Sequence, residues 1–101
     1  MKSFGDMMKT AAKLQRQMTE AQAELAEARF EASAGGGIVR AVVDGRQGLR
    51  ELHLEADALK DGDASLLEDL ILTAVGEAQR TAETHMKEKM GKITGGMQLP
   101  F

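Results

Sequence analysis

The first apolar pattern in the chain has the spacing of a coiled-coil helix. Between residues 4 and 28 the apolar positions follow one another at alternating steps of three and four over more than three heptads. They are Phe4, Met7, Ala11, Leu14, Met18, Ala21, Leu25 and Ala28. A helix over about 4–28 is roughly 37 Å long, more than so short a chain can cover on all sides. We therefore expect part of it to project.

The helical period is lost near Arg29, where apolar and polar residues begin to alternate. In 29–34, Phe30, Ala32 and Ala34 alternate with polar neighbours, which predicts a short strand. Ala and Glu also favour helix, so a continued helix is the alternative for this segment. Three consecutive glycines at 35–37 then break any helix and allow a tight reversal.

A hairpin is predicted next. In the strand expected over 38–44, Val39, Ala41 and Val43 share one face, and 45–48 has the composition of a turn. The return strand, about 49–55, alternates so that Leu52 and Leu54 lie on one face, which we expect to be buried.

A second long helix is predicted over about 65–90, after a polar linker at 56–63. Ser65 and Glu68 have the spacing of a capping box, which satisfies the first free amides of a helix. The apolar positions that follow keep helical spacing. They are Leu67, Leu70, Ile71, Ala74, Val75, Ala78, Ala82, Met86 and Met90. The glycine-containing tail over 91–101 is expected to be loosely ordered.

Two long helices flanking a small antiparallel sheet predict an α+β fold. The helices must pack against one another to bury their apolar rows, and an antiparallel arrangement brings the two chain ends together. Charge is segregated along the chain, because residues 1–19 carry +3, residues 80–101 carry +2 and residues 20–79 carry −8. The fold therefore predicts a basic tip furthest from the sheet and an acidic base, although the net charge is only −3.

The basic residues of the two ends are the candidate functional groups. Lys9, Lys13 and Arg16 lie on one side of the first helix, although a helix N-terminus favours carboxylates by about 0.3–1 kcal/mol each. This unfavourable order indicates phosphate contact, with a merely solvated coiled-coil face as the alternative. The candidate DNA-binding residues are Lys9, Lys13, Arg16, Arg80, Lys87, Lys89 and Lys92.

Composition and motifs argue against several other classes of protein. The chain has no Cys, no long apolar run and no catalytic or nucleotide-binding motif. His53 and His85 lack a second ligand at metal spacing and are expected to have surface or packing roles. With seven Met and few aromatic residues, the packing suits helix against helix. We expect a cytoplasmic, non-enzymatic protein with no metal, cofactor, membrane partner or small-molecule substrate.

Several segments together resemble the YbaB/EbfC nucleoid-associated family over essentially the whole chain. They are the Met- and Gln-rich heptad helix, Gly35 to Gly45, Leu67-Glu68-Asp69-Leu70-Ile71, Lys87-Glu88-Lys89-Met90 and Thr94 to Pro100. The resemblance implies an α-β-β-β-α protomer, a strand at 29–34, and a tweezer-like homodimer built through the sheets. It also implies DNA binding in the nucleoid, altered DNA conformation, and a role in gene regulation or DNA protection.

The resemblance offers no single basic motif to match, so the DNA contacts named above rest on charge and geometry. The residues expected in the dimer interface or core are Val39, Val43, Leu52, Leu54, Leu67, Leu70 and Ile71. A coiled-coil scaffold or a holdase with a prefoldin-like organisation is the competing hypothesis, because two heptad helices bridged by hairpins describe that architecture too. Its apolar tips would be Phe4, Met7 and Met8, with Met90 and Ile93 opposite.

Overall fold

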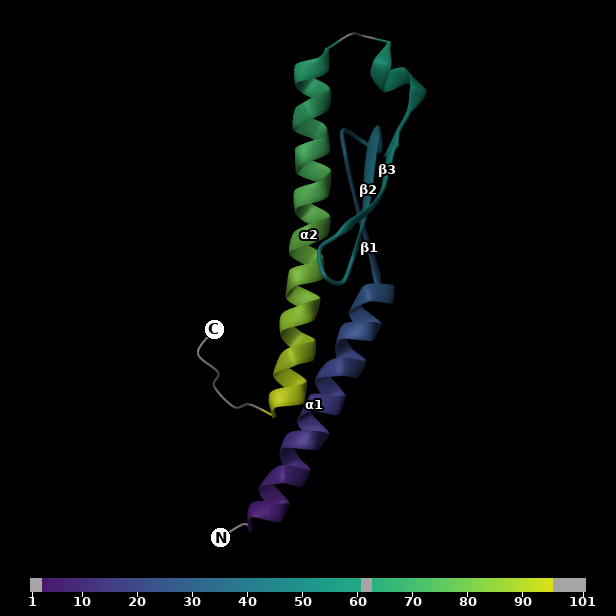
Figure 1. Ribbon diagram of the computed structural model, residues 1–101. Coiled ribbons are helices and arrows are strands. Elements are labelled where there is room, and N and C mark those ends of the chain that lie inside the picture. The colour runs from purple at the N-terminus through teal and green to yellow at the C-terminus, as the bar shows by residue number, and fades with distance from the viewer. Residues whose placement is uncertain (1–2, 61–62, 96–101) are drawn as a thin grey trace.

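The computed structural model describes residues 3–60 and 63–95 (Figure 1). The elements are α1 (Phe4–Glu27), β1 (Arg29–Ala34), β2 (Val39–Asp44), β3 (Leu49–Leu54), the short 3-10 helix η1 (Ala56–Leu59) and α2 (Ala64–Thr94). This order confirms the predicted α+β fold and resolves 29–34 as a strand. The molecule measures 69 × 22 × 16 Å, and its radius of gyration of 19.4 Å exceeds the roughly 13 Å of a compact domain of this length.

The core lies between α2 and two strands of the sheet. The strands form an antiparallel sheet in the order β1-β2-β3, and α2 packs on β1 and β2. Val39, Ala41 and Val43 point toward α2 and are fully buried, as the alternation predicted. The helix meets them with small side chains at steps of four, which allow a close approach of helix to sheet. These are Ala74, Ala78 and Ala82, also fully buried.

The third strand lies outside the cover of α2. Leu52 pairs with Ala41 and Leu54 with Val39, so both leucines lie on the face of the sheet that α2 packs against. They are nevertheless 39% and 38% exposed, because a helix about 10 Å wide spans only two strands at a spacing of about 4.8 Å. The prediction that the return strand buries these leucines is therefore wrong for a single chain.

The two long helices run antiparallel and meet beyond the sheet (Figure 1). Ala21 and Leu25 are buried there, whereas α1 continues past the C-terminal end of α2. We call its residues 4–16 the arm. Phe4, Met7 and Met8 on the arm are 77%, 59% and 56% exposed, so the expected projection of the first helix is confirmed.

The ends of α2 differ from the prediction. Asp63, rather than Ser65, caps the helix, because its Oδ1 accepts a hydrogen bond of 3.0 Å from the Leu66 N–H. The helix also continues through Gly91 to Thr94, so 91–94 is not a loose tail, and residues 96–101 lie outside the described residues. It ends at Gly95, whose φ of 61° is the left-handed conformation that terminates helices.

The β2–β3 turn is held by the buried carboxylate of Asp44. Its Oδ1 accepts backbone hydrogen bonds from Arg46 (2.8 Å) and Gly48 (3.0 Å), and its Oδ2 accepts one from the Arg50 guanidinium (2.8 Å). The bond from the Gly48 amide is the largest cause that holds the pKa of Asp44 below its ordinary value, while burial acts in the opposite direction. The carboxylate therefore defines the shape of the turn.

The same turn joins the sheet to both helices. The Gly45 N–H donates to the Leu25 carbonyl at the end of α1 (2.7 Å). The Gln79 side-chain amide of α2 donates to the Gln47 carbonyl (3.1 Å). A Cβ on Gly45 would lie 2.6 Å from the Leu25 carbonyl oxygen, so only glycine fits this contact. The direction in which α1 leaves the sheet depends on this close approach.

Replacing Gly45 with Ala should separate α1 from the turn. We expect Gly45→Ala to lower the free energy of unfolding by about 2–3 kcal/mol, because a backbone atom has to move. Urea unfolding at a fixed protein concentration measures the change. Gly91→Ala is the matched control. A Cβ at this position meets nothing within 4 Å, so the helix should gain about 0.5–1 kcal/mol. Equal effects of the two substitutions would contradict the role of Gly45.

Asp44 predicts a defined dependence of stability on pH. Because the folded-state pKa is lowered from 3.8, the carboxylate stabilises the fold fully above the unfolded pKa, and this contribution is lost as the pH falls through the folded value. Asp44→Asn should therefore be less stable than the native chain at neutral pH, and the difference should shrink in acid below 3.8. Thermal unfolding of both proteins across this range tests the assignment. A difference independent of pH would exclude it.

Candidate nucleic-acid interface

The clearest cationic surface is a row along the arm. Lys9, Lys13 and Arg16 are all exposed, and within 3–60 and 63–95 none of them forms an ion pair. At 3.6 residues per turn, this row lies about 170° around the helix from the apolar row of the arm. One side of the arm is therefore basic and the other apolar.

The four candidate cations of α2 separate into two pairs. Arg80 and Lys87 are seven residues apart and lie on the side of α2 opposite Ala78 and Ala82, which face the sheet. Lys87 pairs with Glu83 at 3.1 Å, one turn earlier. The structure therefore places Arg80 and Lys87 on the back of α2, away from the row on the arm.

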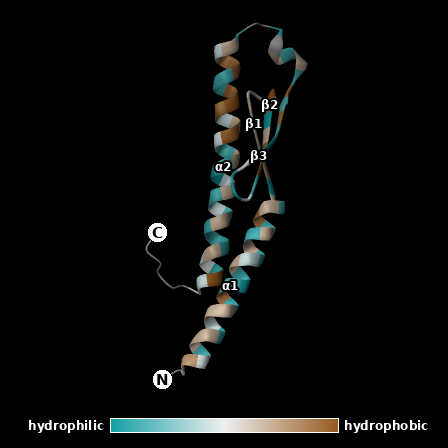
Figure 2. Cartoon of the chain, viewed as in Figure 1, coloured by the Kyte–Doolittle hydropathy of each residue, from teal (hydrophilic) through white to brown (hydrophobic). Residues whose placement is uncertain are grey.

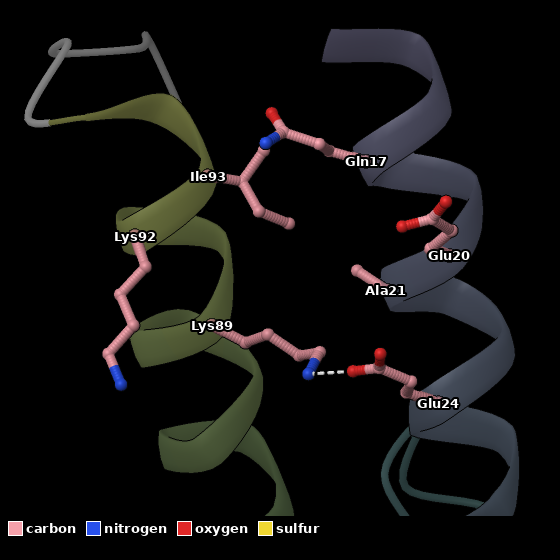
Figure 3. Close-up of a pocket in the computed structure, with 7 residues that line it drawn as sticks. All are labelled: Gln17, Glu20, Ala21, Glu24, Lys89, Lys92 and Ile93. Carbon is pink, nitrogen blue, oxygen red and sulfur yellow. Dashed lines mark ion pairs between the residues drawn. The ribbon is translucent and has the colours of Figure 1, made fainter. Parts of the chain in front are cut away.

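Lys89 and Lys92 instead border a groove of about 250 Å³ between the helices (Figure 3). Lys89 reaches across to Glu24 of α1 and forms an ion pair with its carboxylate, leaving the lysine side chain only 26% exposed. The Lys92 ammonium points away from α1. The remaining groove residues are Gln17, Glu20, Ala21 and Ile93. Because Glu24 neutralises Lys89, this lysine belongs to the packing between the helices.

The prediction that Lys87, Lys89 and Lys92 gather with Lys9, Lys13 and Arg16 at one tip is therefore wrong for Lys87, which lies on the back of α2, and for Lys89, which pairs with Glu24. The C-terminal turn of α2 lies beside Gln17, so the arm extends beyond it and carries its three cations alone. Lys92 is the nearest of the α2 candidates along the helix axis. The two helices differ in how far they reach from the sheet, and residue charges do not reveal that difference.

Sequence reasoning missed the exposed Arg46 and did not single out three arginines with structural roles. Arg46 lies on the exposed part of the β2–β3 turn and forms no ion pair within the described chain. Arg29 donates to the Ala26 and Ala28 carbonyls at the end of α1, while Arg40 and Arg50 pair with Glu31 and Asp44. Strand pairing brings Glu31 close to Arg40 and Asp44 close to Arg50, so the sequence could indicate these two pairs only if the register were known.

The histidines make local contacts in the structure. His53 hydrogen-bonds Glu51 on the outer face of β3 (3.0 Å), and His85 packs on Phe30 with ring centroids 5.1 Å apart. Across 3–60 and 63–95, no group of three or more His, Asp or Glu side chains could hold a metal ion. These contacts agree with surface and packing roles.

An antiparallel sheet with a long covering helix and a projecting arm of unpaired cations has the charge and shape to contact a polyanion such as nucleic acid. Comparison of sequences identifies the class of protein. The chain matches the model of the YbaB/EbfC DNA-binding family over residues 1–97, and it belongs to this family. Among the described helices, none is long and apolar enough to cross a membrane.

Individual relatives agree with this assignment. The chain is 43% identical over 100 residues to a nucleoid-associated protein of Bradyrhizobium sp., covering 99% of this chain and 94% of that one. It is 40% identical over 98 residues to a nucleoid-associated protein of Alkaliphilus metalliredigens, covering 97% and 86%. The crystal structure of an uncharacterised Helicobacter pylori protein has the same fold, with a TM-score of 0.84, 14% identity and coverage of 93% and 99%.

Proposed function

We propose that this protein binds duplex DNA as a nucleoid-associated homodimer in the cytoplasm and alters the conformation of the DNA. The observation that carries the proposal is the row of exposed, unpaired cations on a projecting arm, in a chain of a DNA-binding family. Nucleoid organisation, gene regulation and DNA protection are the roles that such binding would serve. No catalytic step, cofactor or small-molecule substrate enters this proposal.

The arm suits contacts with phosphates rather than with base edges. Its three cations span about 10 Å along the helix, a distance over which one DNA strand carries about three phosphates. Lysine and arginine side chains on one helix side neutralise phosphate charge without reading sequence. Binding should therefore depend steeply on salt and little on sequence. Lys92 extends this surface toward α2, whereas Arg80 and Lys87 would contact DNA only from the back of that helix.

An uncovered apolar surface supports the homodimer. Leu49, Leu52 and Leu54 are 48%, 39% and 38% exposed on the edge strand β3, on the face that α2 packs against but beyond the two strands that it covers. Leu72 is 71% exposed and shares a side of α2 with Gln79, which reaches the β2–β3 turn. Exposed leucines next to an open strand edge favour pairing with another chain. A second copy placed here would cover both the leucines and the edge.

The interface residues named from the sequence therefore divide into two groups. Leu52 and Leu54 remain candidates for the contact between protomers. Val39 and Val43 are fully buried within one chain. Leu67, Leu70 and Ile71 are half-buried and pack against the cluster around Val39. We assign these five to the core of the protomer, where they position α2 on the sheet.

The competing holdase hypothesis receives support from only one side of the expected tip. Phe4, Met7 and Met8 are exposed, but Met90 and Ile93 are half-buried near the level of Gln17, short of the arm. Two opposed apolar tips are therefore not formed within one chain. Replacing Phe4, Met7 and Met8 with Ser should abolish client binding under the holdase hypothesis and should spare DNA binding under ours.

The first test removes the cations of the arm. We expect Lys9→Gln, Lys13→Gln and Arg16→Gln together to weaken binding to duplexes of unrelated sequence and to flatten the salt dependence. Each lost phosphate contact should reduce the slope of log K against log salt by about 0.9. Fluorescence anisotropy titrations at several salt concentrations measure both quantities.

A lysine at the opposite end of the molecule provides the control for this test. Lys60 is exposed and pairs with Asp57 at 3.0 Å near η1, so Lys60→Gln should leave the slope unchanged. Circular dichroism should show that both variants remain folded. If the triple variant keeps the native slope, the arm is not the DNA-binding surface.

A second test asks whether Glu24 holds Lys89 away from DNA. Glu24→Gln removes the charge that pairs with Lys89, so DNA affinity should rise and the salt slope should steepen by up to about 0.9 per chain. Glu20→Gln is the matched control, because Glu20 lines the same groove and the same net charge is removed without freeing Lys89. Equal changes in the two variants would show that only overall charge matters.

A further inference from the structure

The apolar side of the arm is largely uncovered within the described chain, because Phe4, Met7 and Ala11 are exposed and Leu14 is only half-buried. Ala21 and Leu25 are buried where α1 meets the rest of the chain. The same apolar row continues toward the N-terminus through Met18, Leu14, Ala11, Met7 and Phe4. Figure 2 shows the apolar residues of the arm extending past the end of α2. The row has the regular spacing of three and four that fits a neighbouring helix. Since α2 ends at Thr94, beside Gln17, it does not supply that helix.

The residues that flank the apolar row indicate which kind of helix can cover it. In heptad terms, the positions that flank the apolar row on the arm are Met8, Thr10, Gln15 and Gln17. None of them is charged, whereas flanking charges normally select an oppositely charged partner and repel an identical one. Two identical arms therefore meet without like-charge repulsion. A twofold contact requires a self-complementary surface of this kind.

Contacts between the cationic row and DNA would not bury the apolar side of the arm. The cations of the arm, Lys9, Lys13 and Arg16, lie on the opposite side, so phosphate contacts leave Phe4 and Met7 in water. Apolar side chains arranged in a row along one helix side gain most from another apolar row, because burial removes their surface from water. The two sides of the arm thus match two different partners.

We propose that the apolar row of the arm pairs with the same row of a second copy, in addition to the contact proposed at β3. The two contacts involve separate surfaces, so homodimers join through their arms into larger assemblies. When two arms pair, their cationic rows face away from each other. The assembly then presents phosphate-binding rows on opposite sides and can hold two duplexes together, a consequence that rests on the proposed DNA-binding function.

The test compares substitutions on the two sides of one helix. The arm variant Met7→Gln with Leu14→Gln removes the apolar row, and glutamine retains high helix propensity. The matched control is Lys9→Gln with Lys13→Gln, which changes the other side. Sedimentation equilibrium over a concentration range extending to millimolar gives the molar mass of each protein. Circular dichroism at each concentration shows that the chains remain helical.

The native protein and the lysine variant should rise above two chain masses with increasing concentration, whereas the arm variant should stay at two. The proposal is overturned if the arm variant associates like the native protein, or if the native protein never exceeds two chain masses.

DNA affinity, measured in dilute solution, is a separate readout. The arm variant should retain native affinity but lose the ability to capture a labelled duplex on a bead-bound one. If the native chain does not bind DNA, the proposed function is refuted. The molar masses still decide whether the arms pair.

Discussion

The hydrogen bond from the Gly45 N–H to the Leu25 carbonyl is the contact on which the arrangement of the molecule depends. It places the end of α1 against the β2–β3 turn at an approach that only glycine permits. The turn is in turn shaped by the Asp44 carboxylate, and Gln79 ties it to α2. Because a single turn contacts both helices, the direction of the arm relative to the sheet is determined at one place.

This constraint explains why α1 projects instead of folding back on the sheet. Only Ala21 and Leu25 at the end of α1 are buried, while α2 occupies the face of β1 and β2 from Leu67 to Ala82. The arm is then left with a basic side and an apolar side, both facing solvent in a single chain. These two sides are the surfaces on which the proposed contacts with DNA and with a second copy depend.

Charge pairing modifies the simple picture of a basic end. Lys89 forms an ion pair with Glu24, Lys87 forms one with Glu83, and Arg80 faces away from the arm. The row of Lys9, Lys13 and Arg16 is thus the surface most available to phosphates. The Glu24–Lys89 pair also stabilises the contact between the helices, so any gain in DNA affinity from freeing Lys89 comes with a looser groove.

Local periodicity in the sequence determined the two long helices, the β2–β3 hairpin and their order, whereas the 3-10 helix η1 lies in a segment that the sequence predicted to be a polar linker. The heptad spacing from Phe4, the alternation at 29–34 and the buried Val39, Ala41 and Val43 all depend on neighbours within a few residues, so they are readable from the chain. The sequence alone does not reveal the exposure of Leu52 and Leu54, the pairing of Lys89 or the length of the free arm. They depend on the width of α2, on where it ends and on the approach at Gly45, which bring together residues far apart in sequence. Such contacts leave no periodic signal, and only the tertiary structure decides them.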